Sequence, residues 1–382
     1  MISEAPIYFD HAATTPVDPR VAKAVMHHMV EEFGNAGSRT HEYGARSAAA
    51  SEKARKQIGA VVDAEPAEVI FTSGATESDN LAILGLATHG LECNRRHIVS
   101  TAIEHKAVLE PLEALESRGF KIDLISPDQS GAVDSDEVLS RVCDDTLLVS
   151  VMQVNNETGI RQPISAVADG LADPAVFLHS DAAQGFSKDL VPLRHPRLDL
   201  ISLSGHKTYA PKGVGALIVR RRNRKRPPLE PLLVGGGQEN GLRSGTLNVP
   251  GCVGFAAALA LCLEEIPTET NRIRRLRNRL YEGLTNDITQ VELNGPDLHD
   301  LGVRLAGNLN MSFAYVDGEA LMLSMKNLAV SSGSACTSAN PEPSHVLREL
   351  GLNDDASRSS LRFGAGRFNG SEDIEFAIHS VS

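Results

Sequence analysis

Six short apolar runs, separated by stretches with helical periodicity, constrain the fold of this chain more than any other feature. They are EVIFTS (68–73), HIVSTA (97–102), TLLVSVMQV (146–154), AVFLHS (175–180), LDLISLS (198–204) and GVGALIVR (213–220). Most are continuously apolar rather than alternating, as expected for strands that are covered on both faces. Helical stretches such as 77–88 and 105–118 lie between them. The sequence therefore predicts an α/β fold, with a mainly parallel sheet between two layers of helices.

A long helical region over 249–284 ends this alternation. Its second half, NRIRRLRNRLYEGL, puts isoleucine and leucines on one face, and we interpret its arginines as a solvated face. Shorter strands and helices are expected over 291–382. We therefore predict a large domain over 15–260 and a small α+β domain formed by 1–14 and 261–382.

The charge balance and the termini narrow the class of protein. Lys and Arg number 37 against 49 Asp and Glu, a formal net charge of −12, which disfavours direct binding to nucleic acid or to an anionic membrane. The basic run RRRNRKR (220–226) could dock RNA or an acidic partner, but we favour a solvated hairpin or loop. No run of 18 apolar residues and no signal-peptide pattern occurs, so we expect neither a membrane span nor export.

The five cysteines predict free thiols in a reducing, cytoplasmic compartment. They form no CxxC pair, so we expect neither a disulfide framework nor a metal site. We interpret Cys143, Cys252 and Cys262 as small buried hydrophobes and Cys93 as exposed. Cys336 lies among small residues in SSGSACTSAN, which favours an accessible, chemically used thiol over a core residue.

Polar clusters follow four of the apolar runs. They occupy 74–78, 155–159, 181–184 and 205–208. Ligands of open α/β sheets bind beyond the carboxyl ends of the strands, so parallel strands would bring these clusters into one site.

The clusters carry complementary chemistry. The turn over 73–76 precedes a helix and could bind a phosphate, although every helix start offers an ordinary cap. Asp181, at the end of a buried strand, needs a cation: a protonated ring nitrogen or a structural salt bridge. Lys207 could form a Schiff base or merely be solvated. A lysine, a carboxylate and a phosphate site together indicate pyridoxal phosphate.

Two further residues have a functional and a structural interpretation. His105 could stack on a cofactor ring or move protons, or simply begin a helix. Arg362, in LRFGAGRF, could bind a substrate carboxylate or form an ion pair between domains.

The motifs resemble those of the group I cysteine desulfurases of the NifS/IscS type, within the class-V aminotransferases. The matching segments run in family order over nearly the whole chain and are IYFDHAATT, FTSGATESDN, EHKAVLEPL, VNNETG, HSDAAQ, SGHKTYAPKGVG, RSGTLNVP, SSGSACTSANPEPSHVLRELG and LRFGAGRF. The resemblance implies fold type I of the pyridoxal-phosphate enzymes, with a seven-stranded type of sheet, and a homodimer.

The resemblance also implies roles for particular residues. Lys207 would carry the coenzyme, Asp181 would pair with its ring nitrogen, and His105 would stack on the ring and shuttle protons. The other coenzyme contacts would be Ala75, Thr76, Asn156, Gln184, Ser204, His206 and, from a second subunit, Thr246. Asn35, Asn156 and Arg362 would hold the substrate carboxylate, and Cys336 would be the nucleophile.

The implied reaction converts L-cysteine to L-alanine and leaves a persulfide on Cys336 for a sulfur-acceptor protein. That sulfur would serve iron–sulfur cluster assembly, tRNA thiolation or DNA phosphorothioation, with any nucleic acid reached only through a partner. The alternatives are a selenocysteine lyase, another fold-type I enzyme such as an aminotransferase, and a non-enzymatic subunit. The thiol in SGSACTS favours the desulfurase.

Overall fold

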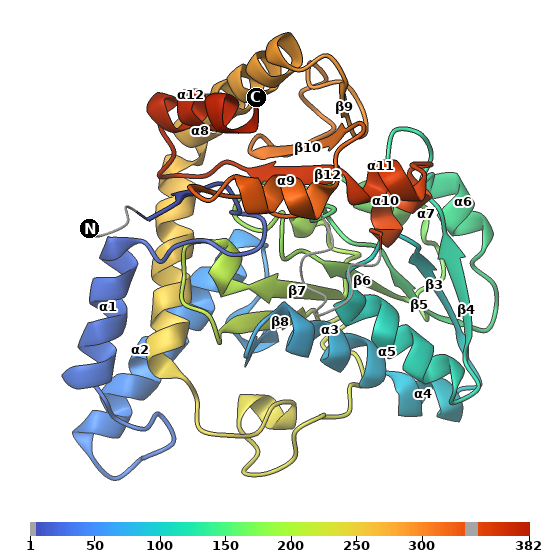
Figure 1. Cartoon of the computed structure of the whole chain (residues 1–382). Coiled ribbons are helices and arrows are strands. Elements are labelled where there is room, and N and C mark those ends of the chain that lie inside the picture. Colours follow the sequence, from blue (N-terminus) through green and yellow to red (C-terminus); the bar gives the residue numbers. More distant parts are fainter. Residues whose placement is uncertain (1–4, 333–342) are drawn as a thin grey trace.

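A seven-stranded sheet forms the centre of the computed structural model, which describes residues 5–332 and 343–382. The strand order is β2-β8-β7-β6-β5-β3-β4, and only β8 runs antiparallel to its neighbours (Figure 1). The strands are β2 Val69–Thr72, β3 His97–Thr101, β4 Lys121–Ile125, β5 Thr146–Ser150, β6 Phe177–Asp181, β7 Leu200–Ser204 and β8 Gly215–Val219. The predicted α/β fold with a mainly parallel sheet is confirmed. The sequence reading missed β4, because this half-exposed strand at the sheet edge lacks a continuous apolar run.

Both faces of the sheet are covered, which explains the continuously apolar strands. Along β2, Val69 and Phe71 enter one core and Ile70 the other. Helices α1, α2, α7 and the first half of α8 build the first core, whereas α3, α4 and α5 build the second. The helices of this part are α1 Pro19–Val30, α2 Glu42–Val61, α3 Ala75–Leu84, α4 Ala87–Glu92, α5 Lys106–Glu116, α6 Ser135–Ser140 and α7 Ile164–Gly170.

Helix α8, Val249–Asp287, is a single helix of 39 residues. By length and composition it could cross a membrane, but half of its apolar window is buried and it packs against α1 and α2, as a core helix does. The interpretation of its arginines as a solvated face is wrong for Arg277, which is 3% exposed. Because α8 crosses residue 260 without a break, the domain division there stays a prediction.

A smaller α+β part follows α8, as expected from residues 291–382. Its antiparallel sheet has the order β12-β10-β9 and packs on α12 and the second half of α8. The amino-terminal strand β1 pairs with β11, so this end of the chain lies against the smaller part. The elements are β1 Ile7–Tyr8, β9 Val291–Leu293, β10 Asn308–Phe313, α9 Gly318–Ser324, β11 Leu328–Ala329, α10 His345–Glu349, α11 Asp354–Arg358, β12 Ser360–Gly364 and α12 Ser371–Val381.

The interpretation of the basic run 220–226 as a solvated hairpin or loop needs a partial correction. The basic run does turn back on itself, with a bridge between Arg222 and Lys225, but Arg220 is buried and donates to the carbonyls of Val62 and Leu193. Cys252 and Cys262 are buried and Cys93 is exposed, as predicted.

Cys143, by contrast, is exposed rather than buried. It lies in the polar loop between α6 and β5, where Asp145 and His97 contact its sulfur. A neighbouring carboxylate and imidazole, rather than apolar side chains, surround the thiol.

A buried ion pair holds the loop before α8 against the sheet. Arg55 donates from Nη1 and Nη2 to the two oxygens of Glu239 at 2.7 and 2.8 Å, and the same carboxylate accepts the N–H of Phe71 at 2.7 Å. Removing one partner of such a pair leaves an uncompensated buried charge.

We expect Glu239→Ala to lower the free energy of unfolding by about 3–5 kcal/mol, measured by urea denaturation. Glu375→Ala is the matched control, since Arg279 binds Glu375 in the same two-pronged way at 2.8 and 3.1 Å but both side chains are more than half exposed. The control should leave the urea midpoint nearly unchanged. Equal losses in the two variants would contradict the assignment.

Candidate active site

A cavity of about 570 Å³ lies at the carboxyl ends of β2, β5, β6 and β7. These four strands run parallel, so their polar ends open at one edge of the sheet, as the sequence predicted. The predicted site residues that line it are Ala75, Thr76, His105, Asn156, Asp181, Gln184, Ser204, His206, Lys207 and Arg362. The volume suits a small-molecule ligand, whose pockets range over about 300–1,000 Å³.

One end of the cavity is built to receive an anion. Helix α3 begins there, and the N–H groups of Ala75 and Thr76 have no acceptor within the helix. A Cβ on Gly215 would lie 2.6 Å from the Cα of Gly74, so only glycine lets β8 approach this turn. The buried Oγ of Ser204 has no hydrogen-bond partner among the described residues. Backbone donors, a helix dipole and a free hydroxyl together suit a phosphate.

The lysine predicted to react lies directly after β7, in the short 3-10 helix Gly205–Lys207. Its Nζ donates to the carbonyl of Ala12, which also accepts from Nε2 of Gln184 at 2.8 Å. Next to it, burial lowers the pKa of His206 to about 4, so this imidazole is neutral near pH 7. An amine held by a backbone carbonyl keeps a fixed place in the cavity.

Asp181 is the last residue of β6 and is nearly buried. Its Oδ1 accepts the N–H of Ala183 at 2.9 Å. Burial, with a smaller contribution from Asp79, raises the pKa of Asp181 to about 6. No ion pair joins Asp181 to another side chain in the part of the chain that the structure describes. The salt-bridge alternative therefore finds no partner there, and the carboxylate is available to a cation that enters the cavity.

His105 begins α5 as its cap, as the structural interpretation expected, and it also lines the cavity; its stacking on a cofactor ring and its proton transfer stay predictions. Its Nδ1 accepts the N–H of Ala107 at 3.1 Å, which places the proton of the neutral ring on Nε2. Burial lowers the pKa of His105, and the charge of Asp181 only partly offsets this. The ring is therefore neutral near pH 7 and can accept a proton only after its Nδ1 bond is exchanged, or donate one from Nε2.

Arg362 forms an ion pair, but its partner Asp10 belongs to the same predicted small domain, and its binding of a substrate carboxylate stays a prediction. It lies on β12 and lines the cavity, while Nη2 pairs with Asp10 at 2.8 Å and Nη1 donates to the carbonyl of Asn156 at 2.9 Å. Its buried Nε has no partner among the described residues. The guanidinium therefore joins the smaller part of the chain to the loop after β5 and still has a donor left.

Two predicted residues of the described part of the chain do not line this cavity, and a third cannot be placed. Asn35 and Thr246 do not line it within one chain. Cys336 lies outside the described residues.

The comparisons with known proteins agree with this arrangement. The model of the class-V aminotransferase family matches residues 7–376. The chain belongs to this family. It is 48% identical to cysteine desulfurase IscS of Methylococcus capsulatus over 376 residues, which cover 98% of this chain and 91% of that protein.

Solved structures place the chain in the same group of the family. A NifS-like protein superposes with a TM-score of 0.90 at 34% identity and covers 98% of both chains. DndA from Streptomyces lividans superposes with a TM-score of 0.81 at 49% identity over 94% of this chain and 99% of its own. The chain is therefore an enzyme of the NifS/IscS cysteine desulfurase group.

Class-V aminotransferases are pyridoxal-phosphate enzymes, and the cavity fits this coenzyme. The unpartnered Ser204 hydroxyl and the start of α3 suit its phosphate, Asp181 suits a protonated ring nitrogen, and Lys207 suits its aldehyde.

Several other residues of this class-V enzyme line the cavity but were not predicted, and they include three whose side chains can carry a charge or donate a hydrogen bond. These three are Thr14, Asp79 and Lys212. Each lies within or beside a motif already singled out, and Asp79 follows Thr76 by three residues, so both face the same side of α3. Helical spacing could therefore have found Asp79.

Asp79 should make the stability of this enzyme depend on pH. It is fully buried, with His179 Nε2 3.4 Å from Oδ1, and burial raises its pKa to about 8. Between the unfolded value near 4 and this pKa, the carboxyl is protonated in the folded state but ionised in the unfolded state, so stability falls as pH rises. We expect Asp79→Asn to remove this loss between about pH 6.5 and pH 8 in urea unfolding of the coenzyme-free protein, relative to the wild type.

The control is Asp173→Asn. The N–H of Ala175 and the nearby Arg95 hold the pKa of Asp173 below its usual range, so it stays ionised in both states across that window. Parallel pH dependence of the wild type and Asp79→Asn would overturn the assignment.

Proposed function

We propose that this protein withdraws sulfur from L-cysteine, releasing L-alanine and leaving a persulfide on Cys336. The observation that carries the proposal is that Lys207, Asp181, Arg362 and the start of α3, which suits a phosphate, all line the same cavity. When bound, pyridoxal phosphate supplies an aldehyde that joins to an amine and a protonated ring that accepts an electron pair. A catalyst that activates an amino acid needs an amine base, a ring-nitrogen partner and a carboxylate receptor, and the cavity holds all three.

The side chains divide the work by position and charge. Lys207 would hold the coenzyme and move the proton of the substrate Cα. Asp181 would keep the ring nitrogen protonated, which would relieve the cost of its own uncompensated burial. His105 would contact the coenzyme and exchange protons with the thiols. Gln184, His206 and Thr76 complete the coenzyme contacts.

Arg362 would bind the substrate carboxylate together with Asn156 and Asn35. The free Nε of Arg362, beside the Nη atoms that pair with Asp10 and Asn156, gives a fork that suits a carboxylate.

Cys336 is the proposed sulfur acceptor because described residues that precede and follow it in the sequence contact residues of the site or their neighbours. Before it, Ser331 exchanges backbone hydrogen bonds with Arg362 at 2.7 and 3.4 Å. After it, His345 Nε2 lies 3.0 Å from the carbonyl of Glu104, the neighbour of His105. The Cys336 thiolate attacks the substrate sulfur, forming the S–S bond as the C–S bond breaks.

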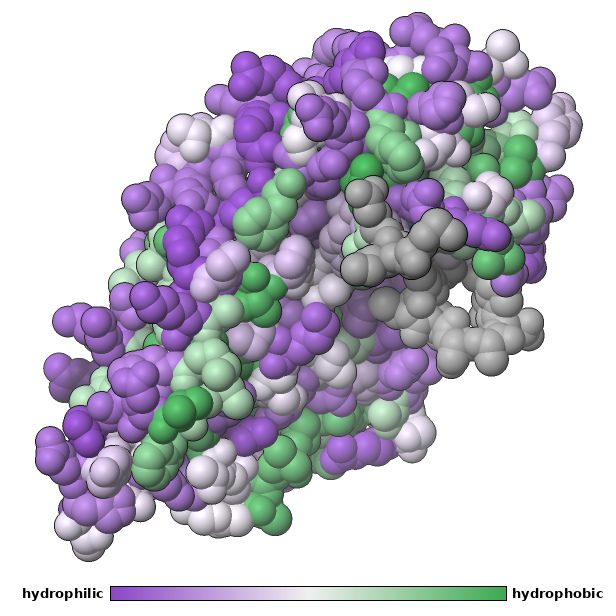
Figure 2. Space-filling model, turned by 60° about the vertical axis from the view of Figure 1, so that its left-hand side comes forward, coloured by the Kyte–Doolittle hydropathy of each residue, from purple (hydrophilic) through white to green (hydrophobic). Residues whose placement is uncertain are grey.

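We further propose a cytoplasmic homodimer that passes the persulfide to an acceptor protein. The four described cysteines are free thiols, in keeping with a reducing compartment. Met26, Met29, Val30 and Phe33 are each more than half exposed, and Figure 2 shows apolar patches on the face that carries α1 and α2. A second subunit on this face would cover them and could bring Thr246 to the cavity. The acceptor would serve iron–sulfur cluster assembly, tRNA thiolation or DNA phosphorothioation.

Cys336→Ala tests the nucleophile. We expect alanine release from L-cysteine to fall by about 10³-fold or more, with no protein persulfide and unchanged coenzyme content, because the acceptor thiol is gone. Cys93→Ala, which removes an exposed thiol elsewhere, should keep normal alanine release and normal formation of the protein persulfide. Sulfide release at the normal rate by Cys336→Ala in the presence of reductant would refute the assignment.

Arg362→Lys tests the carboxylate receptor. A lysine cannot form the two-pronged contact, so kcat/KM for L-cysteine should fall about 10- to 150-fold, equivalent to about 1.5–3 kcal/mol. Binding of 2-aminoethanethiol, which lacks the carboxylate, should be nearly equal in the two proteins by coenzyme absorbance. Equal losses for both thiols would show that Arg362 acts through the cavity structure instead.

A further inference from the structure

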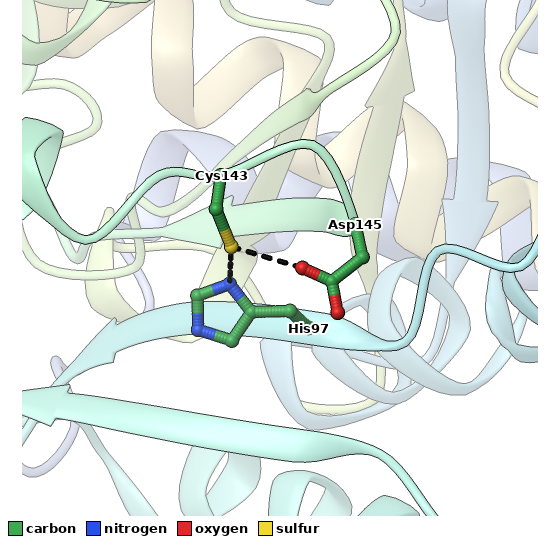
Figure 3. A group of neighbouring side chains, drawn as sticks. All are labelled: His97, Cys143 and Asp145. Carbon is green, nitrogen blue, oxygen red and sulfur yellow. Dashed lines mark hydrogen bonds between the residues drawn. The ribbon is translucent and has the colours of Figure 1, made fainter.

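A second cluster of reactive side chains lies at the opposite edge of the sheet from the cavity. His97 is the first residue of β3, and Cys143 and Asp145 lie in the loop that enters β5 (Figure 3). The cavity lies at the carboxyl ends of the strands, whereas these residues lie at amino ends. Cys143 Sγ is 3.3 Å from His97 Nδ1 and 2.9 Å from Asp145 Oδ1. A nitrogen, a sulfur and an oxygen ligand therefore meet at one point, all within 4.8 Å of one another.

A carboxylate lies behind the ring of His97. The ring is buried, and Nε2 lies 3.2 Å from Oδ2 of Asp123. Thr146 Oγ1 accepts the N–H of Cys143 at 2.8 Å and also lies 2.8 Å from His97 Nδ1, so an ion on Nδ1 would replace the hydroxyl as the partner of that nitrogen. Histidines that bind metals commonly have a carboxylate near their second nitrogen, as Nε2 has here.

Charge and geometry favour a cation of the zinc class. A thiolate and a carboxylate supply two negative charges, which balance a divalent ion at a half-buried site. Sulfur and imidazole nitrogen are the ligands that zinc prefers over calcium or magnesium. Tetrahedral zinc with bonds of about 2.0–2.3 Å places its ligand atoms roughly 3.5 Å apart. Sγ of Cys143 would therefore move about 0.2 Å away from His97 Nδ1, now at 3.3 Å, and about 0.6 Å away from Asp145 Oδ1, now at 2.9 Å. Cys143 and Asp145 are exposed, which leaves a path for the ion and room for a water as fourth ligand.

We propose that His97, Cys143 and Asp145 bind one divalent zinc-class cation, separate from the desulfurase site. The bound ion ties the start of β3 to the loop before β5. The proposal does not depend on the proposed function, because none of these residues lines the cavity.

Zinc binding by the holoenzyme tests the site, measured by equilibrium dialysis against Zn²⁺. A Cys336→Ala background removes the catalytic thiol as a competing ligand. This protein should retain one equivalent of zinc, and the further change Cys143→Ala should abolish that binding. The matched control is Cys93→Ala, which removes another exposed free cysteine and should leave the equivalent in place.

Graded variants separate metal binding from a merely structural role. Asp123→Asn should weaken zinc binding by about 10- to 100-fold, as expected for the carboxylate behind a ligating histidine. Asp145→Asn should weaken it as well, and it covers the case in which Cys143→Ala fails to fold. Cys143→Ala with Cys336 intact should keep normal alanine release.

Two results would overturn the proposal. One is zinc retained at full affinity after loss of Cys143 or Asp145, which would place the ion elsewhere. The other is no zinc retained by the Cys336→Ala protein, which would make the cluster a hydrogen-bonded thiol only.

Discussion

Asp181 is a buried carboxylate at the end of β6, and the character of the cavity depends on it. Its pKa rises to about 6 because burial disfavours the charged form, and no ion pair with another described residue offsets that cost. Asp79, fully buried close by, adds to the same imbalance. The charge of this carboxylate is therefore not fully balanced. A cation that enters the cavity gains a carboxylate partner that the fold has already removed from water. A protonated ring nitrogen has that charge.

The parallel sheet is what brings the complementary groups to this carboxylate. Strands β2, β5, β6 and β7 end at the same edge, and each continues into a polar loop or a helix start. The antiparallel strand β8 lies between β2 and β7, and Gly215 at its start allows the close approach to the α3 turn. The opposite edge collects strand starts instead, which is how His97, Cys143 and Asp145 come together far from the cavity.

The sequence predicted the site better than its surroundings. Motifs at strand ends pointed to Lys207 and Asp181, which line the cavity, because buried strands have a recognisable composition and parallel strands share an edge. The prediction of burial from the sequence was wrong for Cys143 and Arg277, because burial depends on the residues that pack against them. A cysteine in a polar loop and an arginine on a helix carry no local sign of those neighbours. The division near residue 260 is likewise invisible in the continuous helix α8.

Composition and periodicity alone determined that this chain forms a covered parallel sheet, and its strand-end motifs determined the chemistry of one edge. Only the tertiary structure decided which charges stay uncompensated, which side chains combine two contacts, as Arg362 does, and which distant residues gather around one thiol. The reason is physical. Strand and helix formation follow from local spacing, whereas desolvation and ion pairing depend on groups that are remote in sequence.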